Sequence, residues 1–497
     1  MRSERREKEE REKRLQDKEA KRNRTGFAKF TKIWALLFFG INLIFGAMLL
    51  MANILAPKYL LAAGLVALLL FLIVFPPLYS HKTKKNQRVI AFVLSFIIGA
   101  AYLLGVKYLM NTIDFMSQIT KISLSDEYYV VVRDDDMFNE IADIQGETVH
   151  AFNSGSTFEE ATEELKKRVE VEVVPESDLN QTMTDLLSGT SNVVLVASGS
   201  YDTYNDENEG FDDYTKILDS FKIKRQISDI SKRVTVTKEP FNIYITGIDT
   251  AGTIDVTARS DVNMIATVNP NTRTILLTSI PRDYYVLLPD VGAYDKLTHT
   301  GIVGANYTIE TIENMLGIDM NYYVKVNFST VVALVDAIGG IDVVSDYSFV
   351  SSIGGYYFEA GLNENLTGEQ ALAFARERKS FSDGDFQRNK DQQLVLSAII
   401  NKVSQSSTLL WNYGDILNSI EGNLEMNMTS EDLRALIRLQ TSDMSSWNIV
   451  NQNIIGTPSS QYCHSLGYYA SVVLQDQESI NQAVEKIRAV MAGEAIE

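Results

Sequence analysis

Long apolar runs dominate the first quarter of the chain. Three of them, residues 33–55, 59–79 and 89–106, are each close to the roughly 20 residues that a helix needs to cross a bilayer. No Asp or Glu occurs from the first run to the end of the third, which is atypical of a buried helix bundle in a water-soluble protein. The pattern therefore predicts three transmembrane helices behind a charged leader, residues 1–32.

Beyond residue 240, short apolar runs alternate between two periodicities. Runs typical of strands cover residues 242–246, 262–268, 274–279, 322–327 and 341–344. Runs typical of helices cover residues 304–316, 329–338, 368–375 and 386–403. A helix at 430–439, a strand at 447–455 and a helix at 476–491 complete the same domain. This alternation predicts an α/β/α sandwich over residues 240–497, with its motif core at 241–404.

Between the membrane segment and the sandwich, residues 107–235 predict a smaller accessory α/β domain. Its clearest elements are strands at 128–132 and 193–197 and an amphipathic helix at 158–169. Residues 201–213 form an acidic, turn-rich tract whose spacing does not fit an EF-hand loop, so a solvated loop is favoured over a Ca²⁺ site. We expect no chemistry in this domain.

The charges predict the orientation in the membrane. The leader carries thirteen Lys and Arg residues, the loop 80–88 carries four, and the turn 56–58 carries one. Because cytoplasmic segments are rich in Lys and Arg, the amino terminus is expected inside the cell and everything beyond Lys107 outside it. A charge-alternating leader is typical of a solvated tail, and a cytoplasmic contact to a partner or to DNA is the alternative.

The exterior part of the chain is strongly acidic. From Lys107 onward, 28 Lys and Arg stand against 57 Asp and Glu. This balance disfavours nucleic acid and anionic lipid surfaces as partners, so an anionic ligand needs a local basic pocket. The single cysteine, Cys463, excludes an intramolecular disulfide. An exported protein of this size without disulfides is more typical of a Gram-positive bacterium than of a eukaryotic secretory route.

Two aspartates stand at strand ends. Asp249 ends one strand run and Asp261 immediately precedes the next. Ligands of open α/β sheets bind at strand ends, and two carboxylates there could hold Mg²⁺ through oxygen, although turn or cap residues are the more frequent reading of such a pattern. Arg282 follows Pro281, which stops the strand and holds the arginine at the rim of the sheet; a surface salt bridge with Asp283 is the alternative.

A second arginine tract lies about a hundred residues further on. If the chain is extended after the helix 368–375, Arg376 and Arg378 share a face, and Asp385 is placed to cap the next helix. On that helix Arg388 and Gln392 are one turn apart. These residues suit a pyrophosphate clamp, with an exposed, charged helix start as the alternative. The apolar helix at 329–338 is explained by an ordinary core or by a lipid-lining role.

Read together, these tracts resemble the LytR-CpsA-Psr family of cell-wall glycopolymer ligases. The matching segments, in the order of the family, are NIYITGID, ARSDVNMIATVNP, TILLTSIPRDYYV, KLTHTGIVGA, NYYVKVNFSTVVALVDAIGGIDV and LTGEQALAFARERKSFSDGDFQRNKDQQ. The three-helix anchor and the accessory domain are further similar to the streptococcal capsule-associated CpsA branch.

The resemblance implies an activity and a set of site residues. Members transfer a glycan phosphate, here capsular polysaccharide or a related polymer, from an undecaprenyl-pyrophosphate carrier to peptidoglycan, with Mg²⁺ on the pyrophosphate. The metal ligands would be Asp249 and Asp261, and the catalytic residues Asp261, Arg282, Arg376 and Arg378. The pyrophosphate would be bound by Arg259, Arg282, Arg376, Arg378, Arg388 and Gln392.

Some positions lie outside that assignment. Many members have an arginine where this chain has Ala251, so we expect one fewer cation there. Lys296 and His299 fall in a matching segment, but neither is assigned a role. The peptidoglycan acceptor and the membrane are the expected partners, and capsule assembly proteins are further candidates. Two alternatives stay open: a regulator of capsule expression acting through its cytoplasmic leader, and a non-catalytic polyprenyl-phosphate receptor.

Overall fold

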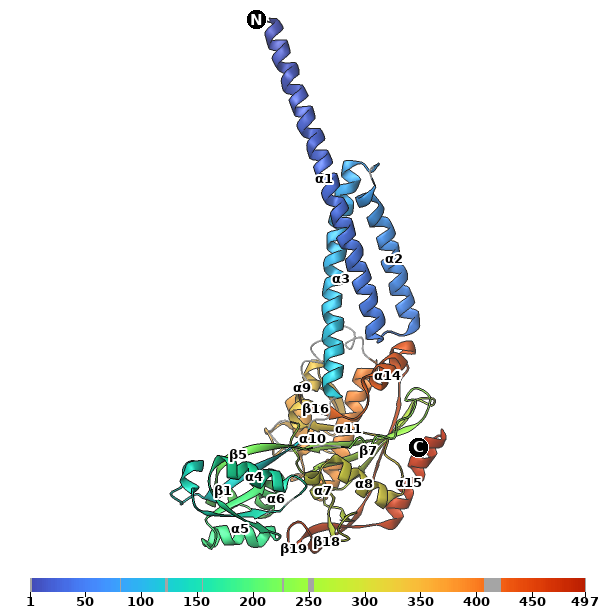
Figure 1. The fold of residues 1–497 in the computed structure, drawn as a ribbon. Helices are drawn as coiled ribbons and strands as arrows, with labels where there is room; N and C mark the ends of the chain where they lie inside the picture. The colour runs from blue at the N-terminus through green and yellow to red at the C-terminus, as the bar shows by residue number, and fades with distance from the viewer. Residues whose placement is uncertain are drawn as a thin grey trace. The chain divides into compact units, whose positions relative to one another are not determined.

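The computed structural model describes most of the chain. The described residues are 2–80, 82–120, 124–153, 155–225, 228–248, 254–405 and 422–496. They divide into two compact units, one formed by Met1–Phe115 with Arg434–Asp443 and the other by Met116–Leu433 with Met444–Glu497. Figure 1 shows the helices and strands of both.

The first unit contains the membrane anchor. Its long helices are α1 (Arg2–Ala52), α2 (Pro57–Tyr79) and α3 (Lys85–Ile119). Each contains a stretch long and apolar enough to cross a membrane, with mean hydropathy of 2.3 to 2.6. The stretches pack through aromatic rings, and Trp34 Nε1 donates a 2.7 Å hydrogen bond to Ser95 Oγ. The three predicted helices are present, and the protein is membrane-anchored.

The helices that contain the first and third spans extend beyond the predicted apolar runs. The first apolar stretch begins at Gly26, and the third continues to Gln118, well beyond the predicted end at Val106. The leader and the first span are one continuous helix, because no proline or glycine interrupts the chain between Arg2 and Thr25. Polar residues such as Asn111 and Thr112 lowered the apolar signal of the third run without ending its helix.

The second unit begins with a five-stranded sheet, which we call the accessory region, residues 124–225. The strand order is β3-β2-β4-β1-β5, with β2 parallel to β3 and β4, and β1 antiparallel to β4 and β5. The strands are β1 (Leu124–Arg133), β2 (Thr148–Phe152), β3 (Glu172–Glu176), β4 (Val193–Ala197) and β5 (Thr215–Arg225). The helices are α4 (Phe158–Arg168), α5 (Leu179–Ser188) and α6 (Ser198–Glu207), with short 3-10 turns at Ile141–Ile144 and Phe211–Tyr214.

The rest of the second unit, the main region, is built on a six-stranded mixed sheet. Its order is β16-β11-β6-β7-β8-β17, with β6 parallel to β11 and β8 parallel to β17. The strands are β6 (Phe241–Ile248), β7 (Val262–Asn269), β8 (Thr274–Ile280), β11 (Tyr322–Asn327), β16 (Leu424–Met426) and β17 (Asn448–Asn453). The main region also has four two-stranded sheets: β9 (Tyr285–Leu287) with β10 (Tyr294–Lys296), β12 (Ile341–Ser345) with β15 (Gly361–Leu366), β13 (Phe349–Val350) with β14 (Tyr357–Phe358), and β18 (Gly456–Cys463) with β19 (Tyr468–Gln475).

Helices cover both faces of the six-stranded sheet. They are α7 (Leu297–Val303), α8 (Ala305–Leu316), α9 (Phe328–Ala337), α10 (Gly368–Arg376), α11 (Gly384–Gln405) and α15 (Gln477–Ala492). A further helix, α14 (Ser430–Asp443), belongs for most of its length to the first unit. Successive side chains of a strand point to opposite faces, so Ile265 packs into the core with α8 and α15, whereas Met264 lines a cavity beside α9 and α11. The fold is the predicted α/β/α sandwich, with a membrane anchor ahead of it.

Two sequence-based expectations about local structure are wrong. The strand predicted at 341–344 does not join the main sheet, because β12 pairs with β15 instead. Residues 201–213 are not a solvated loop, since α6 extends to Glu207 and buries Tyr201 and Tyr204 against the accessory sheet. The limits predicted for the accessory and catalytic domains stay predictions.

The accessory region is tied to the main region by a buried carboxylate. Asp126 on β1 is 3% exposed and accepts a 2.9 Å hydrogen bond from Thr257 Oγ1 of the main region. The same side chain pairs at 2.9 Å with Arg225 on β5. Because a buried charge is costly without partners, this arrangement favours one fixed docking of the two regions.

Candidate active site

A polar pocket of about 820 Å³ lies at one edge of the main sheet. Antiparallel pairing of β7 with β6 and with β8 brings the start of β7 beside the ends of its two neighbours. Segments that leave this edge, together with α10 and α11, supply the charged lining. We call it the cationic pocket; among its lining residues are Arg259, Asp261, Arg282, Arg376, Arg378, Arg388 and Gln392. The structure thus brings together every predicted site residue that it describes.

One predicted metal ligand cannot be placed. Asp249 and Ala251 lie outside the described residues. Asp261, the other predicted ligand, is 7% exposed and accepts a 2.9 Å hydrogen bond from Arg282 Nη1. One of its oxygens also lies 3.9 Å from Arg259 Nη2. In this structure Asp261 therefore positions two arginines.

Two arginines of the pocket, Arg282 and Arg388, differ in their surroundings. Burial would lower the pKa of Arg282, but the Asp283 and Asp261 carboxylates raise it above the usual value. The pKa of Arg388 is lowered, first by burial and then by repulsion from Arg282. Nε of Arg282 lies 3.7 Å from Asp283 Oδ2, whereas Nε of Arg388 is buried without a hydrogen-bond acceptor among the described residues. Such a donor costs about 1–3 kcal/mol, so an anion that reaches Arg388 would be stabilising.

Alternate side chains at the end of α10 and just after it point to opposite sides, as the sequence predicts. Arg376, the last residue of α10, places its guanidinium 4.3 Å from the centre of the Phe328 ring. Arg376 and Arg378 both line the pocket, whereas Glu377 between them is fully buried. Burial would raise the pKa of Glu377, but backbone N–H groups of Ser352 and Ser380 lower it to about 2. Glu377 thus anchors the segment from behind.

Asp385 has a different role from the predicted cap. Helix α11 already begins at Gly384, so Asp385 lies in its first turn. One carboxylate oxygen is 3.0 Å from Arg388 Nη2 and 4.0 Å from Arg378 Nη1. The aspartate therefore holds two of the pocket arginines from different elements in place.

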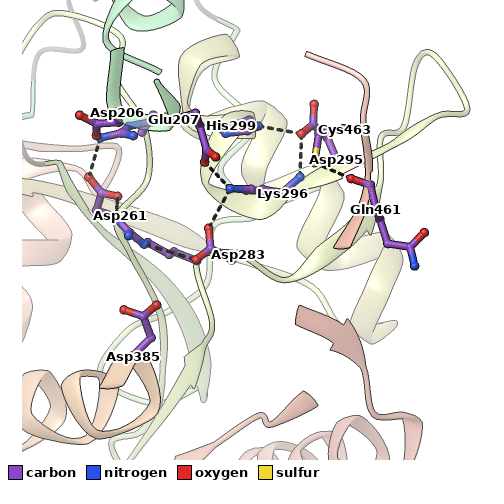
Figure 2. A network of polar contacts seen from close by, with 12 residues as sticks. Asp206, Glu207, Asp261, Asp283, Asp295, Lys296, His299, Asp385, Gln461 and Cys463 are labelled. Atoms are coloured by element: carbon purple, nitrogen blue, oxygen red, sulfur yellow. Dashed lines mark hydrogen bonds and ion pairs between the residues drawn. The ribbon is translucent and has the colours of Figure 1, made fainter. Parts of the chain in front are cut away.

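The accessory region also contributes to the lining of the pocket, although the sequence predicted no site residue in it. Asp206 and Glu207, at the end of α6, line the cationic pocket. Figure 2 shows Glu207 in contact with Lys296. Asp206 forms an ion pair with Arg259, and Glu207 forms one with Lys296. Lys296 is 3% exposed and also lies 3.7 Å from Asp283, so it links α6 to the segment after β8.

Sequence reasoning missed these carboxylates because the tract reads as a turn-rich loop. The signal that could have identified them is the helical spacing within it. Tyr201 and Tyr204 are three residues apart on the buried face, and Asp202 and Asp206 are four residues apart.

An apolar cavity of about 100 Å³ adjoins the cationic pocket. Its walls come from β6, β7, α9, α10 and α11, and include Gly247, Met264, Val331, Leu372, Val395 and Ile399. Four residues line both spaces: Val262, Phe328, Arg376 and Gln392. The junction offers positive charge on one side and hydrocarbon on the other, which suits a ligand with an anionic head and an apolar tail.

Comparison with known proteins identifies relatives of the second unit. The model of the LytR_cpsA_psr family matches residues 201–486. A protein of Bacillus anthracis named polyisoprenyl-teichoic acid–peptidoglycan teichoic acid transferase TagU is 34% identical over 246 residues, which are 49% of this chain and 78% of the relative. The protein of the same name from Enterococcus faecalis is 37% identical over 202 residues, 40% of this chain and 65% of the relative.

Among solved structures, B. subtilis TagV is 30% identical with a TM-score of 0.43, and the match covers 52% of this chain and 99% of that one. The family match spans more than half of this chain and includes residues 201–207 of α6 and every described residue of the predicted site. The chain belongs to the LytR-CpsA-Psr family.

Proposed function

We propose that this protein is a phosphotransferase that moves a glycopolymer from an undecaprenyl-pyrophosphate carrier to peptidoglycan, with capsular polysaccharide as the polymer. The relatives in Bacillus and Enterococcus support the reaction class, because their name describes transfer of polyisoprenyl-linked teichoic acid to peptidoglycan. The choice of capsular polysaccharide rests on the resemblance to the capsule-associated branch.

The observation that carries the proposal is the junction of the cationic pocket with the apolar cavity. A polyprenyl pyrophosphate has both parts that this junction accommodates, since its phosphates need cations and its chain needs an apolar wall. The apolar cavity holds only a short part of such a chain. The remainder would extend beyond it, or α9 and α11 would move apart.

The pocket residues suit phosphoryl transfer. This reaction depends on positioning and on neutralising charge more than on covalent help from the protein. Arg282 and Arg388 supply positive charge for the phosphate oxygens, and Arg376 lies where the charged and apolar spaces meet. Asp261 and Asp385 hold these guanidinium groups in place before substrate arrives, which reduces reorganisation during the reaction.

Mg²⁺ is part of the proposal. The carboxylates in the pocket are the hard oxygen donors that Mg²⁺ prefers, and Asp261 together with Asp249 would hold it. When bound, the ion would neutralise charge on the pyrophosphate. Chelation of Mg²⁺ should stop transfer and lower affinity for a pyrophosphate lipid, while an Asp261→Asn variant should lose most of the response to added Mg²⁺. Equal transfer with and without chelator would reject the metal.

The decisive experiment measures single-turnover transfer and equilibrium lipid binding side by side. Full-length protein in nanodiscs would receive a synthetic polyprenyl-pyrophosphate glycan and soluble peptidoglycan fragments. Arg376→Ala should slow transfer by about 100-fold or more and weaken lipid binding much less. Arg233→Ala, which removes an exposed arginine paired with Asp229 outside the pocket, is the matched control.

Other outcomes favour the alternatives. Wild-type protein that binds the lipid with Mg²⁺ and acceptor present, yet transfers nothing, would be a receptor. If deletion of residues 2–31 removes the cellular phenotype and Arg376→Ala does not, the protein acts as a regulator through its leader.

A further inference from the structure

A second cavity, of about 510 Å³, lies between the accessory region and the main region. The accessory region contributes Asn153, Ser156 and Ser200 to its lining, and the main region contributes Asp290, Tyr307 and Tyr462. We call it the interregion cavity. Its lining combines aromatic rings with hydroxyl, amide and carboxylate groups.

The interregion cavity lacks the cations that a phosphate would need. Arg225 is the only Lys or Arg among its described lining residues. That guanidinium already pairs with buried Asp126 at 2.9 Å and donates to the Val303 carbonyl oxygen. Tyrosine rings with polar groups around them instead suit a neutral ligand with many hydroxyl and amide groups, such as a sugar chain.

His299 connects this cavity to the cationic pocket. It is the only residue in the described part of the chain that lines both spaces. The imidazole lies on α7, 4% exposed, with Nδ1 at 2.7 Å from Asp295 Oδ1 and 2.9 Å from Ser465 Oγ. Figure 2 shows His299 and Asp295 joined in this way, close to Lys296 and Glu207.

The Asp295 carboxylate is fixed in position. It is 1% exposed, and its oxygens accept 2.7 Å hydrogen bonds from the backbone N–H groups of Lys296 and Ser465. Burial would raise the pKa of Asp295, but His299 and Ser465 lower it, so the group is ionised. A carboxylate at Nδ1 keeps the proton on that nitrogen and leaves Nε2 as an acceptor. Among the described residues, both protein partners of the ring lie at Nδ1.

We propose that the interregion cavity binds the acceptor glycan strand and that His299 is the general base for its attacking hydroxyl. The inference rests on the proposed function, which supplies the donor in the neighbouring cationic pocket. The ligand class is a neutral acetamido-sugar chain with a free primary hydroxyl. The accessory region then has a catalytic purpose, because it forms one wall of the acceptor site.

The proposed step is balanced. The acceptor hydroxyl oxygen attacks the phosphorus that carries the glycan, and its proton passes to His299 Nε2. The bond from that phosphorus to the bridging oxygen breaks, and polyprenyl monophosphate leaves with the electron pair. The glycan phosphate is then joined to the acceptor oxygen, and His299 releases its proton to solvent.

The first test is direct binding of a soluble, uncrosslinked peptidoglycan oligosaccharide to the full-length protein in nanodiscs. Asn153→Trp should weaken this binding by at least about tenfold by filling the cavity, and leave polyprenyl-pyrophosphate binding unchanged. Asn153 is exposed, so the larger side chain does not disturb a core. The matched control is Met137→Trp, at a residue of the accessory region that is 83% exposed and outside the cavity.

The second test separates chemistry from binding. His299→Gln keeps an amide that can bond Asp295, and should slow single-turnover transfer by roughly 100-fold while both ligands bind within about twofold of wild type. If His299→Gln transfers the glycan at the wild-type rate, His299 is not the general base. Wild-type oligosaccharide binding by Asn153→Trp, or no binding by wild type, would overturn the acceptor site. If either part of this proposal is overturned but the wild-type protein still transfers the glycan, the proposed function stands. If the wild-type protein binds the lipid without any transfer, the proposed function itself is rejected.

Discussion

Asp206 of the accessory region forms an ion pair with Arg259 in the cationic pocket of the main region. A carboxylate from helix α6 of the accessory region thus pairs with one of the cations that the family pattern assigns to the pyrophosphate. Asp202, one turn earlier on α6, interacts electrostatically with both Arg259 and Asp206. Burial, opposed by Arg259 and reinforced by Asp206, raises its pKa to about 6. A ligand phosphate must share Arg259 with these acids or displace them.

The first prediction is that Asp206→Asn strengthens donor binding. Removing the competing charge should lower the dissociation constant of a polyprenyl pyrophosphate by up to about fivefold, because a half-exposed ion pair is worth at most about 1 kcal/mol. The measurement is equilibrium binding at two ionic strengths. Asp212→Asn makes the same charge change on the same rim without an ion pair in the described structure. Equal gains in both variants would mean that only the general negative field matters.

The second prediction concerns the lipid tail. Val331 on α9 lines the apolar cavity but not the cationic pocket. Val331→Trp should fill the cavity and weaken binding of a long polyprenyl pyrophosphate by about tenfold or more, and barely affect an analogue with one isoprene unit. The measurement is the dissociation constant of wild type and variant for lipids of increasing chain length. If both lipids lose affinity equally, the tail lies elsewhere.

The third prediction is the orientation in the membrane. The Lys and Arg residues of the leader and of the loop 80–88 predict that the amino terminus lies inside, so protease added to intact protoplasts should remove the part beyond Lys107. A tag at the amino terminus should stay protected until the membrane is opened. Protection of the large carboxyl-terminal part would reverse the topology and exclude chemistry at the cell wall.

The sequence predicted the catalytic sheet and the arginine geometry well, because both rest on short-range periodicity. Strands such as β7 and β8 are buried on both faces and read as continuous apolar runs. The alternation at Arg376, Glu377 and Arg378 required only that the chain be extended there. In such segments the neighbouring residues determine which way a side chain points.

Other features depend on contacts between distant segments. The pairing of Asp206 with Arg259 and of Glu207 with Lys296 requires the docking of two sheets, which no local pattern encodes. The same holds for His299. Its proposed role depends on the contact with Ser465, 166 residues away, and on the interregion cavity. For this reason the sequence alone assigned His299 no role.

The fourth prediction turns on a buried carboxyl on α11. Asp391 is 1% exposed, and burial raises its pKa to about 8, although a 2.9 Å hydrogen bond from Gln387 Nε2 opposes the shift. The unfolded chain has a pKa of about 3.9 at this residue, so between the two values the folded protein holds a proton that the unfolded chain has lost. The contribution of protonated Asp391 to the free energy of unfolding is therefore fully present below about pH 4, and it is lost as the pH rises through about 8.

Asp391→Asn should remove this dependence on pH. The amide keeps the shape of the side chain and its acceptor for Gln387, but it cannot ionise. The variant should match wild type in unfolding temperature near pH 4 and exceed it increasingly toward pH 9, by a free energy on the order of a few kcal/mol. Glu359→Gln, at an exposed residue outside α11, is the control for the loss of one carboxylate. Thermal unfolding of the full-length protein across that pH range makes the comparison, and parallel curves for wild type and Asp391→Asn would show that Asp391 is ionised in the folded state.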